Sequence, residues 1–142
     1  MRNTIRRSLA VGSLLAFGLT FGALAQDRDS SWYQTREGFY HGDQWRARLF
    51  DRVREDVDHV QSKTFPVGKD EFRLVRTKQQ LNELQDKMAA HRYDQPELDD
   101  VIGSLQRVVE SNKLSARDRD VLNDDLQHLR DYREHHENWG RP

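Results

Sequence analysis

The chain has 142 residues, of which 33% are charged and 35% hydrophobic, with a formal net charge of −1 and no cysteine. These totals exclude a polytopic membrane protein, a disulfide-stapled miniprotein and a large multidomain enzyme. They also argue against a nucleic-acid-binding protein held by net charge, since such a protein needs a basic surface. The absence of cysteine excludes thiol catalysis, thiolate metal sites and thiol redox switches.

Residues 1–25 are predicted to form a cleavable export signal. A short start with three arginines and no acidic residue precedes an uncharged run over residues 9–24, which three glycines interrupt. A membrane-spanning helix needs about 20 apolar residues, so this run is short for an uncleaved anchor. It ends in Ala23-Leu24-Ala25, the small-x-small pattern that signal peptidases accept. We therefore expect cleavage near Ala25 and a periplasmic or secreted protein of bacterial type, exported by the general secretory or the twin-arginine route.

Cleavage would leave a more acidic and more polar chain. The remaining 117 residues hold 20 basic and 24 acidic side chains, a net charge of −4. Leu, Ile, Val and Phe make up 24 of these residues, about 20%, close to the level at which disorder becomes a concern. Their placement nevertheless predicts a folded chain, because most of them recur at steps of three and four residues, which is helical spacing.

We predict an all-α protein, with a small antiparallel bundle of about four helices over residues 43–136. An aromatic-rich irregular lead over residues 26–42 precedes the bundle, since Gly38 and Gly42 break any long helix there. Residues 137–142 are expected to form a flexible tail. Connections of roughly four to eight residues separate the predicted helices, and such short loops favour antiparallel neighbours.

The first two predicted helices flank a proline. The first begins at Asp43, whose carboxylate can accept an N–H of the first turn, and ends before Pro66, which forces the preceding residue out of the helical region. The second spans about residues 69–90, where Gly68 and Glu71 provide a weak start signal. The apolar stripe of this second helix consists of Leu74, Leu81, Leu84 and Met88.

Two clearer start signals follow along the chain. Asp94 can cap a third helix, whose first turn accommodates Pro96 without the loss of a hydrogen bond. Ser115 and Asp118 form a pattern close to a capping box at the start of a fourth helix. The apolar stripes of these two helices are Leu98, Val101, Ile102, Leu105, Val108 and Val109, and Val121, Leu122, Leu126, Leu129 and Tyr132.

The apolar stripes are narrow for a globular core. Lys78 and Gln85 lie within about 60° of the stripe centre of the second helix, and Asp125 does so in the fourth. One interpretation, which we favour, is a slim, solvated bundle whose long polar side chains extend from its edge to water. The other is a core that is completed by a homodimer or by a helix of a partner.

Histidines and an aspartate near the C-terminus raise the alternative of a metal site. His128, Asp131, His135 and His136 are candidate ligands for a surface Zn²⁺, Cu²⁺ or Ni²⁺, because imidazole and carboxylate suit these ions. The competing interpretation is solvated histidines that interact favourably with a helix C-terminus. An interior di-metal centre is not expected, since the histidines of the Asp-x-x-His pairs in the first and fourth helices, His59 and His128, point away from their apolar stripes. We assign no metal and no other cofactor.

The sequence contains no catalytic constellation. Its serines lack the Gly-x-Ser-x-Gly context of a nucleophile elbow, and the five glycines after residue 25 are scattered rather than gathered in a phosphate-binding loop. Two Asp-x-Asp segments start like calcium loops but lack the glycine and the glutamate that such loops need. We therefore expect a protein that is not an enzyme.

Aromatic residues in and just after the lead form the candidate site for a partner. Rings with neighbouring arginines make good binding surfaces, because they bury area at low entropy cost. The competing interpretation, which we favour, is a strap that lies across the bundle and covers its thin core. The candidate residues are Trp32, Tyr33, Arg36, Phe39, Tyr40 and Trp45.

These patterns favour a small exported helical protein that works by binding, as a chaperone-like or interaction module of the cell envelope with a protein or peptide partner. Periplasmic stress chaperones are similarly small, exported and helical, but their Leu-Thr-x-x-Gln motif does not occur here, so the similarity is one of class. The alternative is a periplasmic metal-binding protein that uses the His and Asp cluster. We expect no nucleic-acid partner and no membrane span after cleavage.

Overall fold

The computed structural model describes residues 30–63, 68–111 and 113–139 of the chain. The predicted export signal, residues 1–25, lies outside the described residues. The chain divides into two compact units, Met1–Tyr40 and His41–Pro142. Within the described residues, no helix combines the length and the apolar character that crossing a membrane requires.

The described part of the first unit is more regular than the predicted irregular lead. Residues 30–37 are helical, and the helix ends in a turn at Gly38. The Thr35 hydroxyl donates to the Ser31 carbonyl oxygen at 3.0 Å, one helical turn earlier. Residues 30–37 contain neither glycine nor proline, so they can form two helical turns before Gly38 ends the helix.

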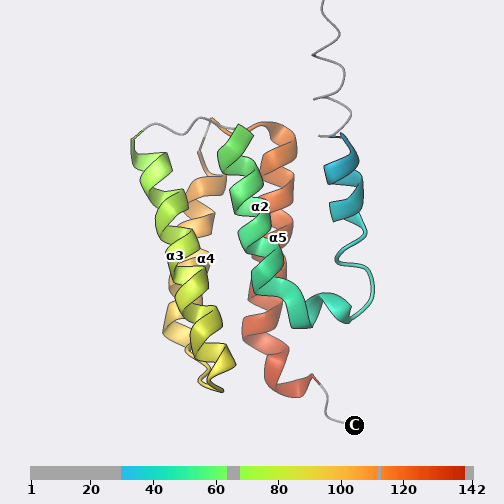
Figure 1. Cartoon of the computed structure of the whole chain (residues 1–142), viewed down its shortest axis with the longest axis vertical. Coiled ribbons are helices and arrows are strands. Elements are labelled where there is room, and N and C mark those ends of the chain that lie inside the picture. Colours follow the sequence, from blue (N-terminus) through green and yellow to red (C-terminus); the bar gives the residue numbers. More distant parts are fainter. Residues whose placement is uncertain (1–29, 64–67, 112, 140–142) are drawn as a thin grey trace, which may run out of the picture. The chain divides into compact units, whose positions relative to one another are not determined.

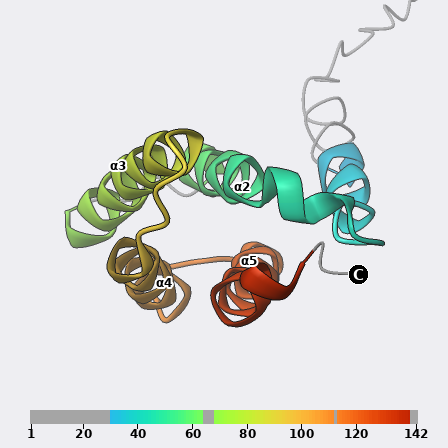
Figure 2. The same ribbon diagram turned by 90° about the horizontal axis from the view of Figure 1, so that it is seen from below.

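The second unit contains four helices that run alternately up and down: α2 (Leu49–Lys63), α3 (Lys69–Ala89), α4 (Gln95–Val109) and α5 (Ala116–His135). Each helix packs against the next one along the chain, and α2 also packs against α5. The four helices therefore surround one core (Figures 1 and 2). This arrangement confirms the predicted all-α antiparallel bundle. No strand occurs in the described ranges.

The core consists of the apolar stripes that the sequence predicts. Burying one leucine or valine side chain stabilises the fold by about 2 kcal/mol, so a dozen such residues supply the main favourable term. The largest fully buried side chains are Leu49, Val53, Val57 and Val60 of α2, Leu74, Leu81 and Leu84 of α3, Leu98, Val101 and Leu105 of α4, and Leu122 and Leu129 of α5.

Of the predicted side-chain caps, those at Asp94 and Ser115 are confirmed and that at Asp43 is wrong. The Asp94 carboxylate accepts the Glu97 N–H at 3.1 Å, and the Ser115 hydroxyl accepts the Asp118 N–H at 3.1 Å. Asp43, in contrast, makes no side-chain cap. Its backbone has a right-handed helical conformation rather than the extended one of an N-cap, and its carboxylate pairs with Arg46 at 3.1 Å. A 3₁₀ turn, η1 (Gln44–Arg48), therefore precedes α2.

Polar residues at the edges of the α3 stripe contact α2. The Gln85 amide donates to the Asp51 carboxylate at 2.6 Å and accepts from Arg54 at 3.0 Å. Lys78 pairs with Asp58 at 2.7 Å, and both side chains reach solvent. These contacts agree with the slim, solvated bundle, because partners within the same unit satisfy the polar residues beside its narrow stripes.

The packing of the second unit continues past α5, into the region predicted as a flexible tail. A second 3₁₀ turn, η2 (His136–Asn138), leads to Trp139. The Trp139 ring meets the rings of Trp45 and Tyr132 edge-on, with centroid distances of 5.4 and 5.3 Å. The Arg46 guanidinium lies 4.5 Å from the Trp139 ring centroid. Residues up to 139 thus contribute to the base of the bundle.

Replacing the cap of α5 tests the helix boundaries. Ser115→Ala removes the acceptor for a first-turn N–H, so we expect the free energy of unfolding, measured by urea titration, to fall by about 1 kcal/mol. Ser115→Asp is the matched control, because aspartate keeps an acceptor at the cap and should retain most of the stability. Equal stability of the original protein and the alanine variant would contradict this helix start.

Candidate binding groove

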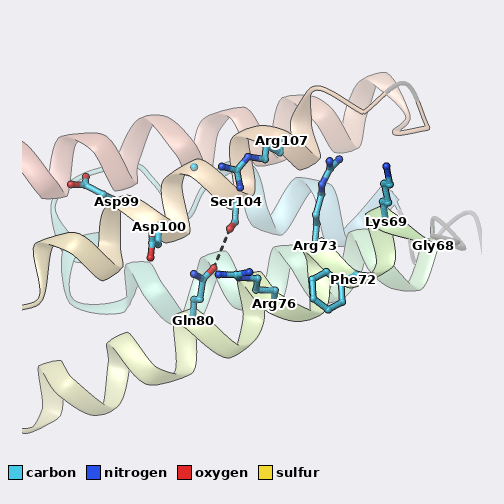
Figure 3. A pocket seen from close by; sticks show the side chains of 11 residues that line it. Gly68, Lys69, Phe72, Arg73, Arg76, Gln80, Asp99, Asp100, Ser104 and Arg107 are labelled. Atoms are coloured by element: carbon cyan, nitrogen blue, oxygen red, sulfur yellow. Dashed lines mark hydrogen bonds between the residues drawn. The ribbon is translucent and has the colours of Figure 1, made fainter.

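A groove lies between α3 and α4 of the second unit. Its volume is about 830 Å³, which lies in the range of ligand-binding pockets. Figure 3 shows its two walls, with side chains of the first half of α3 on one side and of α4 on the other. The lining residues are Gly68, Lys69, Phe72, Arg73, Arg76, Gln80, Asp99, Asp100, Gly103, Ser104 and Arg107.

The helical period explains why this groove is lined by polar side chains. Leu74 and Leu81 place one face of α3 in the core, and Arg73, Arg76 and Gln80 flank that face on the side of α4. The two helices are linked across the groove by a hydrogen bond from the Ser104 hydroxyl to the Gln80 side-chain oxygen, at 3.1 Å (Figure 3).

Gly103 keeps the α4 wall of the groove open. A Cβ atom added at this position would meet no other atom within 4 Å. The glycine therefore is not required by close packing of the helices, although glycine in a helix interior costs about 1 kcal/mol relative to alanine. Its effect in this structure is to leave space in the groove.

Phe72 lies at the edge of the groove and is largely exposed. Its exposed fraction is 67%, and that of Val75, one turn further along α3, is 38%. They are the exposed large hydrophobic residues of the described chain. In a protein this poor in apolar residues, a phenylalanine outside the core provides an apolar contact point beside an open cavity.

Four cationic side chains stand around the Phe72 end of the groove: Lys69, Arg73, Arg76 and Arg107. Within the described part of the chain, Lys69, Arg76 and Arg107 make no hydrogen bond or ion pair through their side chains. Asp99, which also lines the groove, is engaged in contrast, because its carboxylate pairs with Arg133 of α5 at 3.0 Å. At the Phe72 end, Lys69, Arg76 and Arg107 thus present positive charges that no ion pair within the described chain neutralises.

A second cavity of about 460 Å³ continues along the same two helices, and its lining holds four acidic residues and two basic ones. Lys87 there donates to Asp94 at 2.8 Å and also to Glu97. These hydrogen bonds raise the pKa of Lys87 to about 12. The Asp94 carboxylate accepts hydrogen bonds from Lys87 and from the Glu97 N–H, and both lower its pKa. The remaining carboxylates along this stretch belong to Glu83 and Asp100.

The aromatic residues predicted as a partner site are divided between the two units. Trp32 meets Tyr33 edge-on at 4.9 Å in the first unit. There too, Phe39 meets Tyr40 at 5.1 Å and the Arg36 guanidinium lies 5.1 Å from the Tyr40 ring centroid.

Trp45, the last of these aromatic candidates, belongs to the second unit. It is only 6% exposed, and its ring packs edge-on against His128, at 4.6 Å, and against Trp139. The Trp45 ring therefore supports the base of the bundle.

The four candidate metal ligands near the C-terminus contact different neighbours. His128 packs on Trp45 and its Nδ1 lies 3.3 Å from an Asp124 carboxylate oxygen. His135 pairs with Asp131 at 2.8 Å. His136 stacks on the Tyr132 ring at 5.0 Å and lies 4.1 Å from the Tyr93 ring. Among the described residues, no group of three or more His, Asp or Glu side chains is placed to hold a metal ion.

The groove was missed at the sequence level, although one signal pointed to it. Phe72 lies two residues before Leu74, which places it on a different side of α3 from the apolar stripe. Arg73 and Arg76 follow it closely, so a ring outside the stripe is surrounded by positive charge. The contribution of Gly103 and Arg107 depends on the pairing of α3 with α4, which no periodicity within one helix reveals.

The chain matches no model of a known protein family, no curated protein and no solved structure. The functional interpretation therefore depends on the chemistry of its own residues.

The ion pairs of Lys87 predict how stability depends on pH. Because the pKa of Asp94 lies below its ordinary value of 3.8 in the folded protein, this carboxylate stabilises the fold above that pH, and the contribution is lost as the pH falls through the folded-state pKa. Asp94→Asn keeps a cap for α4 but removes the charge. We expect its unfolding free energy, measured by urea titration, to fall less between about pH 5 and pH 2 than that of the original protein. Parallel pH profiles would contradict the ion pair.

Proposed function

We propose that the chain is an exported, non-enzymatic binding module that holds a segment of a protein partner in the groove between α3 and α4. The observation that carries this proposal is the exposed Phe72 ring beside an open cavity of about 830 Å³, with cationic side chains on both walls. An apolar anchor with a polar rim is the usual composition of a protein-binding surface.

A chaperone-like mode of binding suits the properties of this groove. Short segments of a partner can lie between two helices with apolar side chains against the groove and polar ones toward water. A single exposed ring and a few cations would hold such a segment weakly and with limited sequence preference, as a client-binding protein requires. The export signal predicted over residues 1–25 supports a role in the cell envelope.

The metal-binding alternative has less support. His128 and His136 both pack against aromatic rings of the bundle, and His135 pairs with Asp131 alone. We therefore base the proposal on the groove and assign no role to this region beyond packing and surface charge.

Truncating Phe72 tests the groove as the binding surface. Because this ring is largely exposed, Phe72→Ala should change the unfolding free energy by less than about 0.5 kcal/mol. We expect it to weaken the suppression of aggregation of an unfolded client about tenfold in effective concentration, since an anchoring ring contributes about 1–2 kcal/mol. Phe39→Ala, in the aromatic lead, is the matched control. If Phe39→Ala weakened the suppression of aggregation and Phe72→Ala did not, the binding site would lie in the lead and not in the groove.

Two substitutions at Gly103 distinguish an effect on binding in the groove from an effect on the stability of the protein. Both alanine and leucine favour the helix over glycine by up to about 1 kcal/mol, and a Cβ atom at this position would meet no other atom within 4 Å. Gly103→Ala should raise stability and preserve binding, whereas Gly103→Leu should fill the groove and weaken binding without unfolding the protein. The measurements are thermal unfolding and the same aggregation assay. Unimpaired binding by the leucine variant would contradict occupancy of the groove.

A further inference from the structure

The charges along α3 and α4 indicate which partner segment the groove can take. We infer that the occupant is a peptide segment with carboxylates at the Phe72 end, an apolar side chain against Phe72, and neutral or basic residues toward the α3–α4 turn. This inference rests on the proposed function and specifies the chemistry of the ligand.

The cationic end of the groove is suited to carboxylates. Arg76 of α3 and Arg107 of α4 lie on opposite walls (Figure 3), and neither forms an ion pair with a described residue. The planar guanidinium matches a carboxylate through two parallel hydrogen bonds, which are stronger than hydrogen bonds between neutral groups. Lys69 adds a further cation at the beginning of α3. A carboxylate between the two walls could therefore be bound from both helices.

The opposite end of the groove disfavours a ligand that is negative throughout. The second cavity carries Glu83, Asp94, Glu97 and Asp100, and Lys87 is already engaged with two of these carboxylates. An anionic segment that continued in this direction would meet like charges, which is unfavourable. The occupant must therefore change from acidic to neutral or basic along its length.

This change of sign distinguishes a peptide from the other anionic partners. A nucleic acid carries a phosphate at every nucleotide, and an anionic membrane presents negative charge over its whole surface. Both would be repelled by the carboxylates of the second cavity, which shares Arg76 and Gln80 with the first one and which Glu83 and Glu97 line further along the helices. A peptide can alternate acidic, apolar and basic residues, so it alone meets the requirements of both halves and of Phe72.

The test is fluorescence anisotropy of a short labelled peptide that has a run of glutamates, an apolar centre and a run of lysines. The comparison peptide has glutamine in place of each glutamate. We expect the glutamate peptide to bind about tenfold more tightly at low salt, and the difference to shrink as salt screens the charges. Arg76→Glu and Arg107→Glu should each remove this preference. Arg92→Glu, an exposed residue of the α3–α4 turn that lines neither cavity, should leave it unchanged.

Charge reversal adds a readout that unfolding would not produce. The double variant Arg76→Glu/Arg107→Glu should bind a peptide with lysines in place of the glutamates more tightly than the original protein does. Equal binding of the glutamate and glutamine peptides would overturn the inference but leave the proposed function intact, whereas binding of no peptide would end both. Tighter binding of a single-stranded oligonucleotide or of anionic phosphatidylglycerol vesicles, weakened by Arg76→Glu, would also overturn it.

Discussion

The scarcity of apolar side chains is the constraint on which the rest of this structure depends. Four helices of 15 to 21 residues must share one core built from narrow apolar stripes, and α3 provides only Leu74, Leu81 and Leu84 among the fully buried leucines. Its flanks are therefore polar and meet α2 and α4 through hydrogen bonds such as Ser104–Gln80. Against this background Phe72 is exceptional, because it leaves a large apolar side chain outside a core that has few of them.

Most of the bundle could be predicted from local patterns, and the differences have identifiable causes. The stripes of α4 and α5 and the caps at Asp94 and Ser115 are properties of short segments, so they can be read directly along the sequence. Asp43 failed as a cap because η1 gives its backbone a helical conformation. The contacts of Trp139 with Trp45 join residues nearly a hundred positions apart, and no local pattern reveals such a contact.

The groove illustrates the same division between local and tertiary information. The exposed ring of Phe72 is visible in the sequence as a departure from the α3 period, but its meaning depends on α4, which contributes Gly103, Ser104 and Arg107 to the opposite wall. The aromatic residues of the predicted partner site are grouped along the chain, yet Trp45 belongs to the base of the bundle, where it packs against His128 and Trp139. Clustering along the sequence therefore does not reveal that Trp45 is buried, whereas a side chain out of phase with its helix does identify the exposed ring of Phe72.

Amide chemical-shift mapping of the protein, titrated with the glutamate-containing peptide, tests whether the partner segment lies between α3 and α4. We expect the largest shift changes in the two walls of the groove, which are residues 68–80 at the start of α3 and residues 99–107 of α4. Shift changes confined to residues 32–45, with both walls of the groove unaffected, would contradict this location of the partner segment.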